Sequence, residues 1–343
     1  MSHSSLSSAL AVAGNPALAT IALENAGATA LAGGFTTFGQ SFAQGELRPS
    51  DVLTARIGSS DVAVQMDVKT TYPDGTVKMA ILTLERPALD AGGSLDAVIS
   101  ASPSGPPSEQ SVDIAAGLAG HDFNVTVTVA GKPPVNVDVL AALHEALANG
   151  TASFWQSGPL ASQARVEILL QGSQRLVFDV TVFKDGEIAI EAQFNNDRAM
   201  EAVGGRVAYT VVADLDGVQV LNESVSQGQY QNWHRAFSSS EVNGGQGLGD
   251  PLQGWLNIRH DIARLGEIGA VADYDLALVV PATTFSNFAK TMAHDSWGDP
   301  LSNNGVAQYM PAGGARADIG IVTLGNTVWL LTQDARAPPA GMY

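Results

Sequence analysis

Residues that could bind a ligand or take part in catalysis are most frequent in the last third of the chain, after about residue 227. Aromatic side chains are interspersed there with Arg, His, Asn and Gln. A sugar ring offers an apolar face that stacks on an aromatic ring and hydroxyl groups that bind polar side chains, so this mixture favours carbohydrate recognition. The glycan-binding candidates are Trp255, Arg259, His260, Tyr274, Trp297, Tyr309 and Arg316.

The same residue types are also compatible with catalysis. A Tyr or His base, beside an Arg that neutralises a uronate, would provide the chemistry of a polysaccharide lyase. The alternative is that the aromatic residues only pack a region with little regular structure. The sequence leaves these interpretations open and identifies no catalytic residue.

Several common catalytic and metal-binding motifs are absent from the sequence. Three of the six histidines directly precede an aspartate, but adjacent residues on a strand face opposite ways and do not form a catalytic pair. No nucleophile elbow, phosphate loop or closely spaced set of His ligands occurs. We therefore expect no metal site and no cofactor.

The composition excludes several classes of protein. Asp and Glu outnumber Lys and Arg by 34 to 17, giving a formal charge of −17, and such acidity disfavours binding to nucleic acid or to anionic membranes. There are no cysteines, which excludes disulfides and thiolate chemistry. No Lys or Arg precedes Arg48, so the first residues lack the positive region of a secretory signal, and we expect synthesis in the cytoplasm.

The elements that must position any site are mainly β-strands. The expected strands span 35–42, 52–57, 62–69 and 77–84. Apolar and polar residues alternate over 52–57 and 62–69, and β-branched and long apolar residues fill 77–84. Tyr72-Pro73-Asp74-Gly75-Thr76 is a strong turn sequence. We expect a β-barrel domain over residues 33–115, preceded by an N-terminal arm over 1–32.

A second β-rich block follows a Pro- and Ser-rich boundary at residues 103–108. We expect a β-sandwich-like domain over 116–226, with a helix within 137–149 that ends at Gly150. Its expected strands span 123–129, 164–170, 176–183, 188–194, 207–215 and 218–221.

The remaining residues, 227–343, form the loop-rich aromatic C-terminal region. One or two short helices are expected there, one of them within 251–265. The predicted fold class is therefore mainly β, with small barrel or sandwich domains followed by this region.

Two segments resemble known proteins. Residues 38–43 and 72–78, the second with the sequence Tyr-Pro-Asp-Gly-Thr-Val-Lys, resemble the N-terminal RIFT-type barrel of exo-rhamnogalacturonan-lyase-like proteins. Motifs at residues 258–261, 269–275 and 309–320 resemble large proteins of bacteria, prophages and tailed phages. Those relatives continue beyond the point that corresponds to the end of this sequence, into a catalytic or lectin-like region.

The resemblance implies a structural component of a tailed phage or phage-like particle, such as a head decoration, spike or tail-associated protein. Its location would be the virion, its partners other capsid or tail proteins, and its state a homo-oligomer; contact with host polysaccharide is a further expectation. The alternatives are a polysaccharide lyase acting on uronate-containing glycans and a non-catalytic carbohydrate-binding protein.

Overall fold

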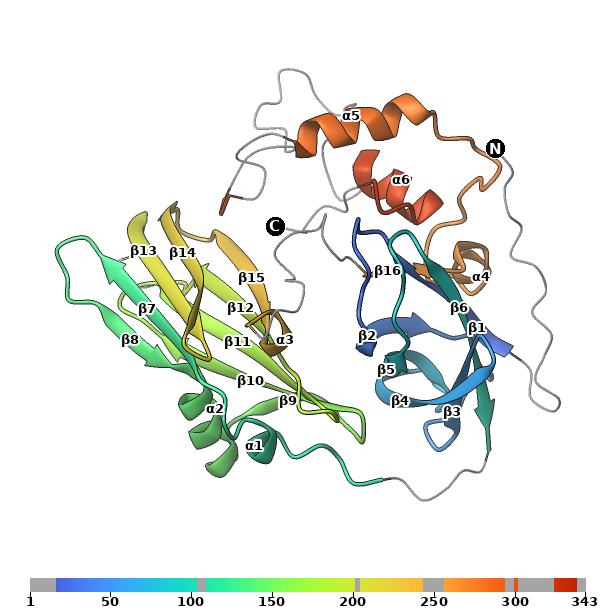
Figure 1. Ribbon diagram of the computed structural model, residues 1–343, viewed down its shortest axis with the longest axis horizontal. Coiled ribbons are helices and arrows are strands. Elements are labelled where there is room, and N and C mark those ends of the chain that lie inside the picture. The colour runs from blue at the N-terminus through green and yellow to red at the C-terminus, as the bar shows by residue number, and fades with distance from the viewer. Residues whose placement is uncertain are drawn as a thin grey trace. The chain divides into compact units, whose positions relative to one another are not determined.

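The computed structural model describes residues 17–103, 109–200, 204–242, 256–293, 299–301 and 324–337. The chain divides into two compact units, each described by itself below. The first, which we call the barrel unit, comprises Met1–Ser111, Gly158–Leu160 and Leu252–Leu276. The second, the sandwich unit, comprises Val112–Ser157, Ala161–Pro251 and Ala277–Tyr343. The predicted mainly β fold class is confirmed (Figure 1).

The barrel unit contains one antiparallel sheet with the strand order β16-β1-β6-β3-β4-β5-β2. Its strands are β1 (Ala17–Asn25), β2 (Gly34–Ser41), β3 (Val52–Ile57), β4 (Ser60–Thr71), β5 (Val77–Arg86), β6 (Ser94–Ser102) and β16 (Leu256–His260). Alternate side chains of each strand, among them Ile21 and Leu23 of β1, point into a shared apolar core. The strands predicted in this part of the sequence are confirmed.

The two end strands of this sheet, β16 and β2, come together through side chains. The His260 ring on β16 meets the Phe38 ring on β2 edge-on, with centroids 6.1 Å apart. The Nδ1 atom of His260 lies 3.3 Å from Oε1 of Gln40, also on β2. Arg264, in helix α4 (Ile262–Glu267), forms an ion pair with Glu46 just after β2. The sheet therefore curls into a nearly closed barrel whose seam contains His260.

The turn between β4 and β5 forms as predicted. Oδ1 of Asp74 accepts hydrogen bonds from the amide of Thr76 at 3.0 Å and from its hydroxyl at 2.6 Å. These bonds favour the ionised carboxylate and hold the pKa of Asp74 below its ordinary value. Gly75 has a φ of +82°, which glycine adopts without strain.

The sandwich unit contains two antiparallel sheets. The five-stranded sheet has the order β15-β12-β11-β10-β9, and the four-stranded sheet has the order β14-β13-β7-β8. The strands are β7 (Phe123–Val129), β8 (Val135–Asp138), β9 (Ser153–Ser157), β10 (Ala161–Leu169), β11 (Gln174–Phe183), β12 (Ile188–Asn196), β13 (Val207–Leu215), β14 (Val218–Gln227) and β15 (Asn232–Ser238). All the strands predicted here are present.

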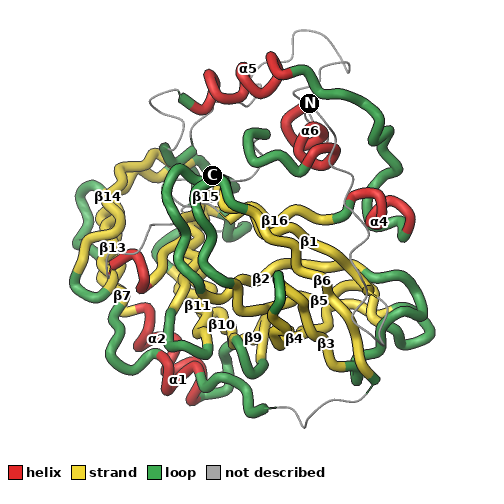
Figure 2. The backbone as a smooth tube through the Cα atoms, turned by 45° about the vertical axis from the view of Figure 1, so that its right-hand side comes forward, coloured by secondary structure: helices red, strands yellow, loops and turns green. Residues whose placement is uncertain are grey.

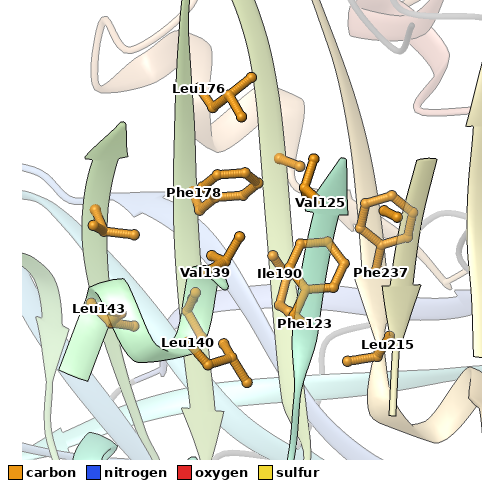
Figure 3. Packing of buried hydrophobic residues seen from close by; sticks show 14 of the residues in the cluster. Phe123, Val125, Val139, Leu140, Leu143, Leu176, Phe178, Ile190, Leu215 and Phe237 are labelled. Atoms are coloured by element: carbon orange, nitrogen blue, oxygen red, sulfur yellow. The ribbon is translucent and has the colours of Figure 1, made fainter. Parts of the chain in front are cut away.

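The core of this unit lies between its two sheets. Phe123 of β7 packs against Phe178 of β11 and Phe237 of β15, with ring centroids 6.0 and 5.4 Å away. Figure 3 shows these rings among the aliphatic side chains that fill the same space. Burying each large side chain contributes about 1.5–3 kcal/mol, so this layer holds the five-stranded sheet in a fixed shape.

Five helices belong to the sandwich unit in the described ranges. Helix α2 (Val139–Ala148) buries Val139, Leu140 and Leu143 against the core, and Gly150 follows it with a φ of +65°, as predicted. The other helices are α1 (Ile114–Gly117), α3 (Ser239–Val242), α5 (Ala282–Met292) and α6 (Leu324–Thr332). Among the helices of the described ranges, none has the length and apolar character needed to cross a membrane.

Two parts of the sequence interpretation differ from the structure. The helix predicted within 251–265 is wrong over 256–260, where the chain forms β16 beside β1 (Figure 2), and helix α4 begins only at Ile262. Strand pairing prevails there because Ile258 and His260 lie opposite Leu23 and Ile21 and share their core-facing side. Residues 17–25, interpreted as part of an N-terminal arm, form β1 of the barrel.

Candidate functional site

Four of the seven glycan-binding candidates chosen from the sequence, Trp255, Trp297, Tyr309 and Arg316, lie outside the described residues. The other three, Arg259, His260 and Tyr274, belong to the barrel unit. The described ranges therefore contain three of the seven candidates, all in one unit.

Arg259 and His260 are neighbours on β16, but they face opposite sides of the sheet. Arg259 is exposed, whereas His260 lies opposite Ile21 and packs on Phe38 in the barrel seam. Burial there lowers the pKa of His260 below its ordinary value. Tyr274 is half-buried in the irregular chain that follows α4. The two β16 residues thus do not present a common surface to a ligand.

A different site emerges on the sandwich unit, on the side of the five-stranded sheet that faces away from the core. A cleft of about 370 Å³ opens there over β9, β10, β11 and β12. Sites for small molecules generally have volumes of about 300–1,000 Å³, so this cleft has the size of a ligand site. The lining residues are Ser153, Phe154, Trp155, Gln163, Arg165, Asp179, Glu191 and Gln193.

Strand alternation brings the charged residues to this face. Ala164 and Val166, the neighbours of Arg165, point into the core, as do the neighbours of Asp179 and Glu191 on their own strands. Because successive side chains of a strand point to opposite faces, the charged residues point outward. The register then pairs Arg165 with Asp179 and Asp179 with Glu191, so the three form one row across three strands.

Arg165 and Asp179 form a bidentate ion pair at the centre of this row. Nε of Arg165 donates to Oδ1 of Asp179 at 2.7 Å, and Nη2 donates to Oδ2 at 2.6 Å. These bonds raise the pKa of Arg165. The Arg165 side chain is 48% exposed, and its Nη1 has no acceptor among the described residues. One edge of the planar guanidinium, at Nη1, can therefore donate a hydrogen bond to a ligand.

Glu191 supplies an acceptor at the end of the row. Its Oε1 lies 3.5 Å from Nδ1 of His234 on β15, and this contact lowers the pKa of Glu191. The carboxylate is consequently ionised at neutral pH, and 49% of the side chain is exposed. Glu191 can accept hydrogen bonds from hydroxyl groups in the cleft.

Two glutamines extend the polar surface. Gln163 donates through Nε2 to the Thr181 hydroxyl at 2.8 Å, which leaves its Oε1 to accept. The Gln193 side chain has no partner in the described ranges and can both donate and accept. The cleft thus combines fixed donors and acceptors of the kinds that sugar hydroxyls satisfy.

The apolar part of the cleft comes from edge strand β9. Phe154 and Trp155 are 56% and 51% exposed, which is unusual for two consecutive large aromatic residues. The register with β10 pairs Ala164 with Phe154 and Gln163 with Gln156, so Trp155 is the extra residue of a β-bulge. A bulge redirects side chains, which explains why two sequence neighbours both border the cleft.

The cleft was not among the sites predicted from the sequence. The available signal was the pair Phe154-Trp155 between Gly150 and Gly158-Pro159, together with charged residues at alternate positions of strands whose other positions are mostly apolar. Within the described ranges, no group of three or more acidic or His side chains could hold a metal ion.

The comparisons with known proteins leave the chain without an assigned family. No known protein family matches it, and no curated protein has significant sequence similarity to it. The resemblance to lyase-like and phage proteins therefore stays a prediction from the sequence motifs.

Proposed function

We propose that this protein binds glycans without cleaving them, through the outer cleft of its five-stranded sheet. The observation that carries the proposal is the placement of Phe154 and Trp155 beside a row of polar side chains on a rigid sheet. The aromatic rings would stack on the apolar faces of sugar rings, and the polar row would bind their hydroxyl groups.

The dimensions of the cleft favour a chain of sugars. Neighbouring strands lie about 4.8 Å apart, so the span from β9 to β12 is about 14 Å, enough for more than one ring of a polysaccharide. The ligand would run across the strands, from the aromatic edge toward Glu191 and Gln193.

The residues of the cleft support binding more than catalysis. Glycoside hydrolysis needs one carboxyl group that is protonated and able to act as an acid. Asp179 is bound to Arg165, and the contact with His234 keeps Glu191 ionised. Among the described residues, no His lines the cleft to act as a base for a lyase or for a nucleophilic serine.

We place this activity on the surface of a tailed phage or phage-like particle. The support is the resemblance of two sequence segments to phage and prophage proteins. A glycan-binding virion component would hold the particle on host polysaccharide, and several copies in one particle would increase the overall affinity through multivalency.

Affinity electrophoresis of the full chain against a panel of polysaccharides tests the proposal. We expect retardation by at least one polysaccharide, with binding weakened at least tenfold in Trp155→Ala. Tyr230→Ala, which removes another exposed aromatic ring of the sandwich unit, is the matched control and should bind normally.

Two results would overturn the proposal. One is binding that survives Trp155→Ala in a folded variant, or no binding to any polysaccharide. The other is release of unsaturated sugar that absorbs in the near ultraviolet, because this product would identify the protein as a lyase.

A further inference from the structure

We infer that the cleft selects uncharged sugar residues and discriminates against uronates and other anionic sugars. This inference rests on the proposed function and adds the class of glycan. It follows from the charges that line the cleft and from which of their hydrogen-bonding atoms are already used.

The charge of the cleft is negative. Arg165 is the only cation among the described residues that line it, whereas Asp179 and Glu191 are both anions. The charge of Arg165 is matched by Asp179, whose two oxygens accept its Nε and Nη2 hydrogens. Glu191 therefore contributes a negative charge that no described lining residue neutralises; its partner is the imidazole of His234 on β15, 3.5 Å away and outside the lining. A sugar carboxylate in the cleft would be repelled by Glu191.

The next cation along the same face of the sheet, Arg175, does not make the cleft positive. Arg175, two rows from Asp179 along β11, is bound to Asp197 through two hydrogen bonds and to Glu167 through a third. Its guanidinium is thus paired with two carboxylates. A uronate would find no cation there that lacks a carboxylate partner.

The hydrogen-bonding atoms that remain suit neutral sugars. Glu191 and Oε1 of Gln163 accept, Nη1 of Arg165 donates, and Gln193 does both. Each hydroxyl of a neutral sugar donates and accepts, so adjacent hydroxyls can satisfy both kinds of atom. A carboxylate only accepts, so it could pair with the donors of Arg165 and Gln193 but would leave the acceptors unpaired.

The test uses a matched pair of glycans: polygalacturonate and the neutral galactan obtained by reducing its carboxyl groups. These are supplemented by the neutral polymers dextran, xylan and mannan. Binding of the full chain is measured by affinity electrophoresis and by calorimetry. We expect the best neutral polymer to bind at least tenfold more tightly than polygalacturonate.

Variants connect the selectivity to Glu191. Glu191→Gln removes the negative charge and keeps a polar side chain, so it should reduce the discrimination against polygalacturonate at least fivefold. Glu145→Gln makes the same charge change at an exposed position of α2, outside the cleft, and should leave the discrimination unaltered. Circular dichroism establishes that each variant is folded.

The outcomes separate the two proposals. Tight binding of polygalacturonate that is lost in Trp155→Ala overturns the inference on charge while the glycan-binding function stands. Discrimination that is identical in wild type and Glu191→Gln also overturns the inference. Binding to none of the polymers, or binding that does not depend on Trp155, overturns the proposed function itself.

Discussion

Arg165 and Asp179 face each other across β10 and β11 and are joined by two hydrogen bonds of 2.7 and 2.6 Å. The pair is asymmetric, because the Arg165 side chain is 48% exposed and that of Asp179 only 10%. Arg165 is consequently held in one orientation by a carboxylate that is itself nearly buried in the sheet surface. This fixes the direction of the remaining donor of Arg165 and reduces the side-chain entropy that the protein would lose when a ligand binds.

The asymmetry predicts unequal effects of removing each partner. Arg165→Met leaves a largely buried carboxylate unpaired and should lower the free energy of unfolding by about 2 kcal/mol. Asp179→Asn leaves a cation that water can solvate and should cost about 1 kcal/mol or less. Urea unfolding of the single variants and of the double variant measures both values and the coupling between the two side chains. Equal costs for the two single variants would contradict this account of the pair.

A buried hydrogen-bond network among Trp233, Tyr209 and Gln227 in the sandwich unit predicts a second effect on stability. Nε1 of Trp233 donates to the Tyr209 hydroxyl at 2.8 Å, and that hydroxyl donates to Oε1 of Gln227 at 2.8 Å. Tyr209→Phe leaves both partners unsatisfied and should lower the free energy of unfolding by about 1–3 kcal/mol. Denaturant unfolding checks this, with Tyr230→Phe, at an exposed position, as the control.

The same tyrosine gives the protein a stability change at alkaline pH. Burial raises the pKa of Tyr209 to about 12, against an ordinary value near 10. Between these values the folded state keeps a proton that the unfolded state releases, so stability falls as the pH rises above about 10. Tyr209→Phe should show a smaller decline than wild type over this range. Parallel declines in the two proteins would contradict the role assigned to burial.

Ten of the sixteen strands in the described residues were predicted from the sequence, because their signals are local. Alternation within 52–57 and 123–129, and turn sequences such as that around Gly75, suffice to locate strands and hairpins without knowledge of their partners. Strand β1 was missed because its Ala-rich sequence resembles an arm, and its place in the barrel depends on pairing with β16, more than 230 residues later.

The cleft could not be predicted because its residues are assembled by register. Arg165, Asp179 and Glu191 come from three strands, and their spacing along the chain indicates nothing about their adjacency. A shift of one residue in either pairing would turn one of these charges toward the core. The orientation of Trp155 likewise depends on a bulge in β9 that appears only when β10 is in place. The aromatic residues after 227 were the more visible signal in the sequence.

The barrel seam predicts a stability change at mildly acidic pH. Burial lowers the pKa of His260 in the folded state. As the pH falls, the imidazole is therefore protonated in the unfolded state before it is protonated in the folded state. Stability should therefore decrease as the pH falls below about 6.5, the ordinary value for His. His260→Gln keeps a polar side chain beside Gln40 and should remove this part of the pH dependence.

Thermal unfolding between pH 5 and 7.5 checks the prediction about the seam. His144→Gln, at an exposed position of α2, serves as the control and should retain the wild-type profile. If the stability of His260→Gln depended on pH as that of wild type does, protonation of His260 would not be the cause of the decline.

Helix α1 packs closely on strand β11, and this contact predicts that a larger residue at position 117 destabilises the protein. A Cβ atom added at Gly117 would lie 2.3 Å from Cγ1 of Val182, far inside van der Waals contact. Val182 is 1% exposed and β-branched, so it has little freedom to move aside. Gly117→Ala should therefore lower the free energy of unfolding by about 1–3 kcal/mol. Val182→Ala creates the missing space, so the double variant should be more stable than the sum of the two single effects implies.

Urea unfolding of the three variants tests this, with Gly34→Ala as a control at a position where an added Cβ has open space. Strictly additive losses would mean that the cost of Gly117→Ala does not come from contact with Val182.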